Sequence, residues 1–243
     1  MIKHAKLSAS GAHRWLNCPG SVKVEEGLPD KQTIFAQEGT GAHELAEIAL
    51  SKRINPFDWV DKPLITENAI TVSEEMARNV QRYIDYINQF DGELLVETRV
   101  DFSDWVQEGF GTVDAIIIND DVIRVIDLKY GKGVKVYADN NPQGMLYALG
   151  ALSDFGVVYD FKTVEIAIVQ PRIDHISEWT IAVNELLEWG EWVKERVQLA
   201  LQDDAPLVPE RKTCQWCKAK SSCEAAYTRN KQSILNDFDV IDS

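Results

Sequence analysis

The sequence lacks several features that would assign it to particular classes of protein. No apolar run follows the N-terminal Met-Ile-Lys-His, and no stretch of the 243 residues approaches the length of a membrane span. Internal repeats and low-complexity linkers are also missing. These absences argue against secreted, membrane-spanning and repeat proteins, so we expect a soluble, cytoplasmic protein with no membrane partner.

Positive charge is scarce as well. The chain has 25 lysines and arginines against 39 aspartates and glutamates, which gives a formal net charge of −14. This balance argues against a protein that holds nucleic acid through basic side chains alone, because phosphate contacts normally come from lysine and arginine. A metal site supplies positive charge of its own, so a metal-dependent nucleic-acid enzyme is compatible with the composition.

The sequence does contain enough apolar residues for a sizeable core. Hydrophobic residues make up 45% of the chain and seven of them are tryptophans, so we expect one folded domain with at most a small appendage. Helical and strand patterns follow one another as helix, three strands, helix, two strands and helix. That order predicts an α/β fold, a three-layer α/β/α sandwich around a mixed central sheet.

The predicted elements rest on apolar periodicity and on capping residues. An amphipathic helix within Val72–Phe90, opened by Ser73, carries Val80, Tyr83 and Ile84 at three- and four-residue steps. We interpret this helix as a core-packing element. Strands are also expected over residues 94–102, 164–170 and 178–183, and helices over residues 7–18, 37–52 and 184–202.

One hairpin near the middle of the chain carries a set of polar groups. Two apolar strands, GTVDAIII and DVIRVIDLK, flank a turn, and a two-residue loop at 120–121 sets their pairing. In that register Asp114 lies opposite Asp127, with about 5 Å between the Cβ atoms. Lys129 shares a face with Asp127 because side chains alternate along a strand. Two carboxylates and a lysine then converge, an arrangement that binds a divalent metal ion and places an ammonium group beside it.

A helix is expected after this hairpin. Asn141 is a suitable N-cap, and Pro142 suits the first helical position. Gln143 would occupy the first turn, where free backbone N–H groups favour phosphate, and Tyr147 would share its face. We expect these two side chains to position a substrate strand or to hydrogen-bond the catalytic groups.

The same acids also have an ordinary structural interpretation. Asp114 and Asp127 could be strand-end residues that are solvated or paired with Lys129. The strands are apolar on both faces, however, so helices are expected to cover both sides of the sheet. Charges in such a sheet are costly unless a metal ion or a partner compensates them.

The four cysteines are arranged as one early residue and a late trio. Cys18 precedes the predicted core, and Cys214, Cys217 and Cys223 follow its last helix. Disulfides are not expected without an export signal, and a CxxC close to a third cysteine indicates a metal site for which Cys18 is the available fourth ligand. Zinc and a [4Fe–4S] cluster both accept four thiolates, and the spacing does not separate them.

Together these motifs resemble those of the PD-(D/E)XK nuclease superfamily. GTVD supplies Asp114, IDLK supplies Asp127 and Lys129, and the Q-x-x-x-Y helix is typical of the RecB-like branch. Val113 stands where the family usually has a proline. The resemblance implies a restriction-endonuclease-like fold and metal-dependent hydrolysis of DNA in recombination or DNA processing, as an exonuclease rather than an endonuclease.

The resemblance also implies a set of metal ligands. The segment EGTGAHELAE is similar to the helical histidine motif of RecB-like nucleases, in which His43 would be a ligand. Together with Asp114, Asp127 and the Leu128 carbonyl, it would hold one or two Mg²⁺ or Mn²⁺ ions. Lys129 would orient or deprotonate the attacking water molecule.

A glutamate on the preceding strand has two interpretations. Related nucleases sometimes carry a glutamate at this place, so Glu97 could join the acidic group. By the two-residue period of a strand it also shares a face with Arg99, so the two could form a structural pair.

The cysteines match a subset of RecB-like nucleases that includes the AddB nuclease domain and the CRISPR-adaptation exonucleases. Those proteins have one cysteine before the nuclease core and three after it, and a [4Fe–4S] cluster ties their chain ends together. The resemblance therefore implies one nuclease domain over residues 1–243, with the Cys18 segment joined to residues 205–231 by such a cluster. Zinc is the less favoured occupant. The run SASGAHRWLNCPGS also resembles a phage and prophage family of this type.

DNA is the implied partner, with a recombination or annealing protein as a further candidate. Residues 205–231 hold six lysines and arginines against two glutamates, and Lys129, Lys132 and Lys135 form a second basic strip, so weak, salt-dependent DNA affinity is expected. Two other functions stay open. One is a non-catalytic DNA-binding protein with a nuclease-like fold, and the other is a zinc-stapled interaction module whose acids only pair with lysines.

Overall fold

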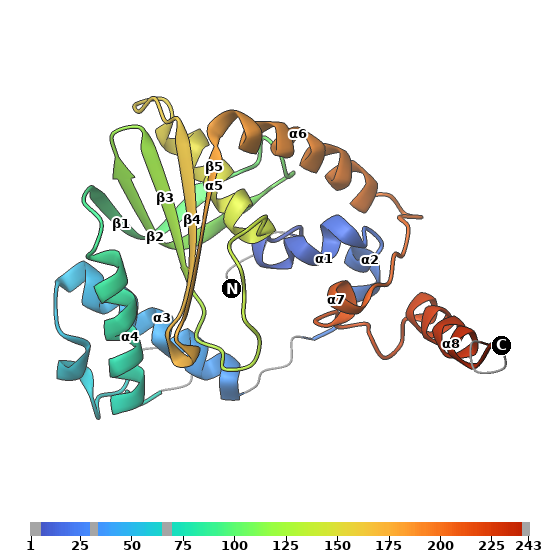
Figure 1. The fold of residues 1–243 in the computed structure, drawn as a ribbon, viewed down its shortest axis with the longest axis horizontal. Coiled ribbons are helices and arrows are strands. Elements are labelled where there is room, and N and C mark those ends of the chain that lie inside the picture. Colours follow the sequence, from blue (N-terminus) through green and yellow to red (C-terminus); the bar gives the residue numbers. More distant parts are fainter. Residues whose placement is uncertain (1–5, 30–33, 65–69, 240–243) are drawn as a thin grey trace.

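The centre of the protein is a five-stranded sheet whose strands stand in sequence order (Figure 1). The computed structural model describes residues 6–29, 34–64 and 70–239, with side chains as far as residue 233. Strands β3 and β4 run parallel and the other neighbours run antiparallel, so the sheet is mixed. The strands are β1 (Glu93–Asp101), β2 (Phe110–Asn119), β3 (Val122–Leu128), β4 (Thr163–Gln170) and β5 (His175–Ala182).

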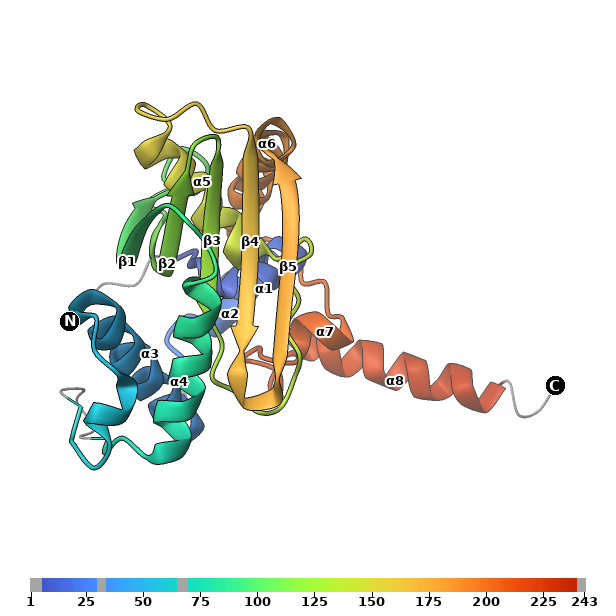
Figure 2. The same ribbon diagram turned by 60° about the vertical axis from the view of Figure 1, so that its left-hand side comes forward.

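Helices cover both faces of the sheet (Figures 1 and 2). One face packs against α3 and α4 and the other against α1, α5 and α6, and each face has its own buried apolar cluster. The predicted three-layer α/β/α sandwich is therefore confirmed. The helices are α1 (Ala12–Asn17), α2 (Ser21–Glu25), α3 (Ile34–Lys52), α4 (Glu74–Ile87), α5 (Pro142–Phe155), α6 (Val183–Ala200), α7 (Arg211–Cys214) and α8 (Glu224–Asp239), with 3-10 turns η1 (Ala9–Gly11), η2 (Pro56–Trp59) and η3 (Pro171–Ile173).

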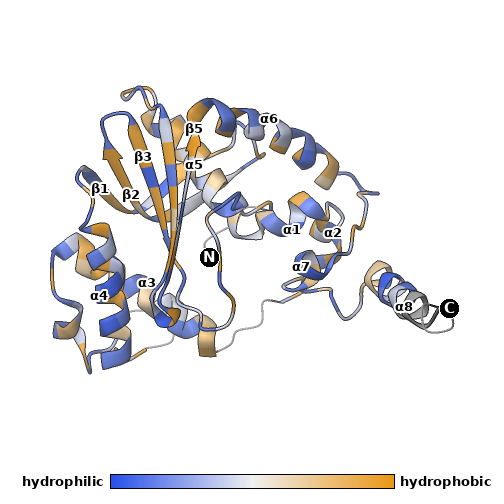
Figure 3. Cartoon of the chain, in the orientation of Figure 1, coloured by the Kyte–Doolittle hydropathy of each residue, from blue (hydrophilic) through white to orange (hydrophobic). Residues whose placement is uncertain are grey.

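The apolar runs of the central strands explain this layering. Along β2, Ile116 and Ile118 belong to the cluster under α5, whereas Ala115 and Ile117 belong to the cluster under α3 and α4. Strands β2 and β3 are mostly hydrophobic along their length (Figure 3). A strand with apolar side chains on both faces needs cover on both, and the parallel step from β3 to β4 requires a crossover that α5 provides.

The hairpin between β2 and β3 has the predicted register. Ala115 pairs with Ile126, and the turn occupies residues 120–121. Asp120 has a φ of +46°, in the left-handed region that tight hairpin turns require. A short turn leaves little freedom in the pairing of the strands that it joins, so the register could be derived from the sequence.

The caps of two helices are also as predicted. Asn141 Oδ1 accepts a hydrogen bond from the Gly144 backbone N–H at 3.1 Å, and α5 begins at the next residue after this cap. Ser73 Oγ accepts one from the Met76 N–H at 3.1 Å at the start of α4. Each cap satisfies a backbone donor that has no partner within its own helix.

Three elements begin three or more residues away from their predicted start. The expected helix over residues 7–18 opens with a 3-10 turn, so that its α-helical part begins at Ala12. Helix α3 begins at Ile34 rather than at residue 37. Strand β5 begins at His175 rather than at residue 178, because its ladder with β4 continues as far as the pair Gln170–His175. The extra residues are in strand conformation because they pair with β4, and the sequence of β5 alone does not predict them.

Pairing between β1 and β2 is interrupted at one position on each strand. The pairs on either side are regular, but Glu97 and Asp114 between them are not paired. Glu97 has a φ of +45°, which is costly for a residue other than glycine, above all within a strand. Leu95 and Val100 both pack with the cluster under α5, although strict alternation would put them on opposite faces. The strand alternation is therefore broken where the acids lie.

An early and a late segment of the chain, α1–α2 and the segment around α7, meet beside the sandwich (Figure 1). The Gly20 N–H donates to the Pro206 carbonyl at 2.9 Å, and the Lys218 N–H donates to Glu25 Oε1 at 2.6 Å. Helix α8 then extends away from the body (Figures 1 and 2). Within the described ranges, no helix combines the length and the apolar character needed to cross a membrane.

Candidate metal centre

Acids from three neighbouring strands form one row across the sheet. Continuing the registers of the adjacent pairs places Glu97 opposite Asp114 and Asp114 opposite Asp127. Asp127 is buried, with 6% of its surface exposed, and the other two are partly buried. Glu97 and Asp114 lie where the β1–β2 pairing is interrupted, so regular strand alternation does not set the direction of these two side chains.

Helix α3 brings a histidine to this row. The inner face of α3 is a stripe of buried alanines and a leucine, and His43 lies at the edge of that stripe. Its Nδ1 is 2.9 Å from Asp114 Oδ1. One ligand atom each from His43, Glu97 and Asp114 lies within 4.8 Å of the other two. The predicted histidine and first aspartate are thus together, and Glu97 is the third member of the group.

Both oxygens of Asp114 are engaged. Oδ1 faces His43, and Oδ2 accepts a hydrogen bond from the Leu128 backbone N–H at 2.6 Å. This bond joins a side chain of β2 to the main chain at the end of β3, and it fixes the carboxylate between the two strands. Leu128 thus meets the site through its N–H, and the ligand role implied for its carbonyl stays a prediction.

Asp127 is the centre of a second network, shared with α5. Lys129 Nζ lies 2.8 Å from Asp127 Oδ2 and 3.0 Å from Oδ1. Gln143 donates through Nε2 to Asp127 Oδ1 at 3.0 Å and accepts from Lys129 Nζ through Oε1 at 2.9 Å. Its Nε2 is also 3.2 Å from Tyr147 Oη. The Gln143 side chain therefore hydrogen-bonds both Asp127 and Lys129, and a catalytic role for this network stays a prediction.

The glycine of the GTVD motif allows Tyr147 to approach. A Cβ atom added at Gly111 would lie 2.5 Å from Cε1 of the Tyr147 ring, a distance that real Cβ atoms do not show. Only glycine leaves room for the ring against β2 at this point. The motif glycine and the motif tyrosine are therefore packing partners, which the sequence spacing did not reveal.

The charges of the row act on one another. Burial, followed by the negative charge of Asp114, raises the pKa of Glu97 to about 7. Burial also raises the pKa of Asp127, although the Lys129 ammonium opposes this. Burial lowers the pKa of His43, but the neighbouring Asp114 outweighs it and the net shift is upward. Burial is the main cause of the raised pKa of the two acids, and the negative charge of Asp114 raises the pKa of all three groups.

These residues fit a hard divalent cation. Carboxylate oxygens with an imidazole nitrogen are ligands that Mg²⁺ and Mn²⁺ accept. Lys129 neutralises Asp127, whereas in the described part of the chain no lysine or arginine forms an ion pair with Glu97 or Asp114. A divalent cation held at His43, Glu97 and Asp114 would supply the positive charge that these carboxylates lack.

The cysteines lie where the α1–α2 segment meets the segment around α7. Cys18 follows α1 and is buried, and its Sγ accepts the Val208 N–H at 3.2 Å. Burial raises the pKa of Cys18, and the neighbouring Cys214 and Cys223 add to this rise. Cys214 and Cys217 line a cavity of about 1620 Å³ between the two segments. Among the described residues no three of these thiols come within 4.8 Å of one another, so a shared cluster stays a prediction.

Two of the three lysines in the predicted basic strip are engaged within the protein. Lys129 pairs with Asp127, and Lys132 Nζ lies 2.9 Å from Glu75 Oε1 on α4. Basic side chains of the C-terminal segment line the same cavity as the cysteines. These are Arg211, Lys218, Lys220 and Arg229.

Comparison with known proteins gives a match over nearly the whole chain. The family described as "Protein of unknown function (DUF2800)" matches residues 4–242. The chain belongs to this family. Among solved structures, the chain is similar to one titled "Crystal structure of SSO0001", at 15% sequence identity over 93% of this chain and 89% of that chain, with a TM-score of 0.42.

Glu97 is the residue that the sequence of this DUF2800 protein left undecided. Its neighbours in the site are Asp114 and His43, whereas the guanidinium of Arg99 lies 4.1 Å from the centre of the Phe110 ring. Strands β1 and β2 are joined by residues 102–109 rather than by a short turn. The register of β1 against β2 could therefore not be counted from the sequence, and the sequence did not predict that Glu97 lies opposite Asp114.

Proposed function

We propose that this DUF2800 protein is a divalent-metal-dependent deoxyribonuclease of the RecB-like branch of the PD-(D/E)XK superfamily. The observation that carries the proposal is a juxtaposition: the group of His43, Glu97 and Asp114 adjoins the hydrogen-bonded pair of Asp127 and Lys129. The three-layer sandwich around a mixed sheet supports it, because that is the architecture of restriction-endonuclease-like folds.

The acidic row and the histidine would hold the metal. His43, Glu97 and Asp114 are the main ligands of one or two Mg²⁺ or Mn²⁺ ions, with Asp127 and the Leu128 carbonyl completing the set. When bound, such an ion offsets negative charge on the phosphate and makes water a better nucleophile at neutral pH.

The protein's own contribution begins with Lys129. Asp127 and Gln143 contact its Nζ at 2.8 and 2.9 Å, and these two contacts set the direction of the ammonium group. An ion-paired ammonium is a hydrogen-bond donor, so its role is to orient the attacking water and to stabilise charge on the phosphate oxygens rather than to take a proton. Gln143 and Tyr147 keep this arrangement in place from α5.

The substrate would be DNA that is degraded from an end, as an exonuclease does in recombination or DNA processing. A recombination or annealing protein is a suitable partner for such an activity. The four cysteines would hold a [4Fe–4S] cluster, with zinc as the less favoured occupant. The contacts between the Cys18 segment and the segment from Val208 onward support this part of the proposal.

The proposal is tested with end-labelled single- and double-stranded DNA incubated with Mg²⁺, with Mn²⁺ or with excess EDTA. We expect cleavage with either metal and none with EDTA. Asp114→Asn should lower the rate by at least about 100-fold, because it removes a ligand charge from the metal site. Asp85→Asn is the matched control, since Asp85 is an exposed acid of α4 that accepts a hydrogen bond from Gln81, and its rate should equal that of the wild type.

Two results would overturn the proposal. One is cleavage that persists in EDTA, and the other is full activity in a folded Asp114→Asn variant. A wild-type protein that binds Mn²⁺ and DNA without cleaving either strand would identify the non-catalytic DNA-binding alternative instead.

A further inference from the structure

Helix α4 buries a tyrosine in the layer beneath the acidic row. Tyr83 belongs to the apolar stripe of α4, and none of its surface is exposed. It is part of the same cluster as Ala115 on β2 and Ile126 and Leu128 on β3. These three residues are the immediate sequence neighbours of Asp114 and Asp127. Tyr83 therefore shares a buried cluster with the two strands that carry these acids.

The hydroxyl of this tyrosine has no hydrogen-bond partner among the residues that the structure describes. Tyr83 Oη is buried and makes no hydrogen bond with any residue that the structure describes. A buried hydroxyl without a partner is costly, and nearly all such groups in native proteins are hydrogen-bonded. A phenylalanine would fill the same space without that cost, so packing alone does not account for the hydroxyl.

The carboxylates of the row act on this hydroxyl through their charge, and residues adjacent to them in sequence belong to the same buried cluster as Tyr83. Burial, followed by the negative charges of Asp114, Asp127 and Glu97, raises the pKa of Tyr83 well above its usual value. The phenol is therefore close enough to all three acids to be affected by their charges, and it retains its proton. A phenol O–H is a hydrogen-bond donor, and the partners that suit it are anions or the oxygen ligands of a cation.

We propose that Tyr83 is a positioning residue of the metal centre: its hydroxyl donates a hydrogen bond to a water ligand of the divalent cation held by His43, Glu97 and Asp114. Mg²⁺ gives up its water reluctantly and usually keeps several water ligands in proteins. Donors around a metal site orient such ligands and tune the affinity for the ion. The inference rests on the metal centre of the proposed function but does not require that DNA be the substrate.

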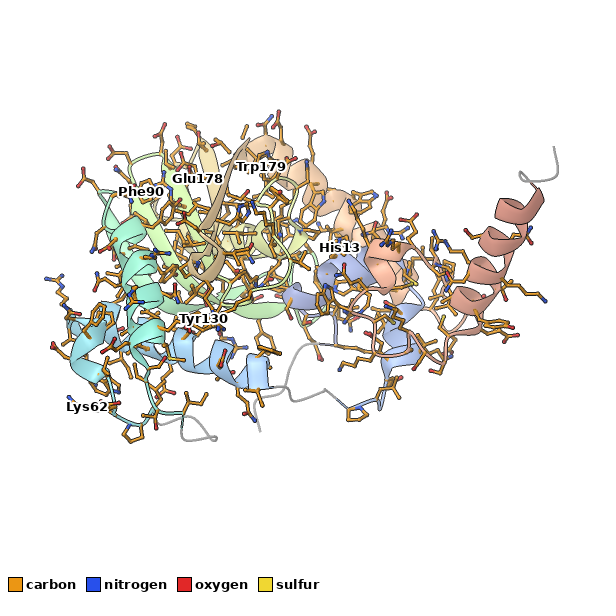
Figure 4. The ribbon with its side chains drawn as sticks, turned by 60° about the horizontal axis from the view of Figure 1, so that its bottom comes forward. His13, Lys62, Phe90, Tyr130, Glu178 and Trp179 are labelled. Atoms are coloured by element: carbon orange, nitrogen blue, oxygen red, sulfur yellow. The ribbon has the colours of Figure 1, made fainter. Side chains whose placement is uncertain are left out.

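A second tyrosine of the same helix provides the matched control. Tyr86 is also buried, but its hydroxyl donates to Glu178 Oε1 on β5 at 2.6 Å, and its ring packs edge-on against Phe90. Figure 4 shows Glu178 and Phe90 at the same end of the molecule. Tyr83→Phe and Tyr86→Phe each remove one buried hydroxyl from α4: the first has no hydrogen-bond partner in the described part of the chain, and the second donates to Glu178.

The experiment measures two quantities for the wild type and both variants. Mn²⁺ affinity is obtained by titration with detection of free Mn²⁺ by electron paramagnetic resonance, and the melting temperature is measured in EDTA. Tyr83→Phe should bind Mn²⁺ about tenfold more weakly while melting at or above the wild-type temperature. Tyr86→Phe should show the opposite pattern, with wild-type Mn²⁺ affinity and a lower melting temperature, because Glu178 loses its donor. Asp114→Asn reports any Mn²⁺ bound elsewhere.

Several outcomes would overturn the inference, and they are distinguishable from a failure of the proposed function. Wild-type Mn²⁺ affinity in Tyr83→Phe would show that the hydroxyl does not act on the centre. A melting temperature of Tyr83→Phe in EDTA that falls as far as that of Tyr86→Phe would show that the hydroxyl has a partner within the protein. A wild-type protein without Mn²⁺ binding at Asp114 would overturn both the centre and the inference. Weakened binding in Tyr83→Phe of a protein that cleaves no DNA would overturn the nuclease and support the inference.

Discussion

Replacing Lys129 by methionine removes one charge while keeping most of the length of the side chain. In the wild type, the ammonium lies 2.8 Å from Asp127 Oδ2 and 2.9 Å from Gln143 Oε1. Asp127 is 6% exposed, so the variant leaves a carboxylate in a place where water cannot replace the lost cation. We expect the metal-free protein to be destabilised for that reason.

The size of the effect follows from the burial of the pair. Removing one partner of a buried ion pair costs about 3–5 kcal/mol. Asp127 keeps the hydrogen bond from Gln143, and the side chain of Lys129 is 30% exposed, so the lower end of that range, about 3 kcal/mol, applies. For a chain of this length each kcal/mol corresponds to about 2–4 °C, so the melting temperature should fall by about 6–12 °C.

The effect should also depend on pH. Asp127 has a raised pKa in the folded protein because of its burial, so its protonated form favours folding below the unfolded pKa of about 3.9. That contribution is lost as the pH rises through the folded pKa. Without Lys129 the folded pKa rises further. The stability gap between the variant and the wild type should therefore be small near about pH 4 and widen toward neutral pH.

Thermal unfolding in EDTA at several pH values measures this gap, and a double variant separates charge from packing. Lys129→Met combined with Asp127→Asn has no unpaired charge, so it should regain more than half of the lost stability. Its nuclease activity should still be absent because the ammonium is gone. A Lys129→Met variant that is as stable as the wild type at neutral pH, or a gap that narrows as the pH rises, would refute the reasoning.

Two further predictions concern the helix after the hairpin and the cysteines. Gln143→Ala should reduce turnover by about 10–100-fold with a smaller effect on the melting temperature, and a variant that unfolds without any specific loss of turnover in its folded fraction would contradict this. Wild-type protein purified without oxygen should be brown, with about four iron and four sulfide per chain, and Cys18→Ser should be colourless and melt at a lower temperature. Stoichiometric zinc in a colourless wild type would contradict the cluster, and a fully stable and active Cys18→Ser variant would contradict any shared metal site.

The sequence by itself determined the features that local rules govern. A two-residue turn allows one pairing of its strands, so the register that carries Asp114 toward Asp127 could be counted. Asn141 and Pro142 mark the start of a helix whatever surrounds it, which placed Gln143 in the first turn of α5. Apolar residues on both faces of β2 predicted a covered sheet, and therefore three layers.

Only the tertiary structure decided which groups share the site. The register of β1 against β2 spans a long connection, so nothing local places Glu97 opposite Asp114. The left-handed backbone of Glu97 breaks the alternation on which strand-face arguments depend. The periodicity of α4 showed that Tyr83 would be buried but not that it would join the cluster of Ala115 and Leu128 with its hydroxyl unpaired among the described residues, because hydrophobic periodicity reports the face of a helix and not what lies across from it. Contacts between elements distant in sequence arise from packing, and packing is settled by all the layers together.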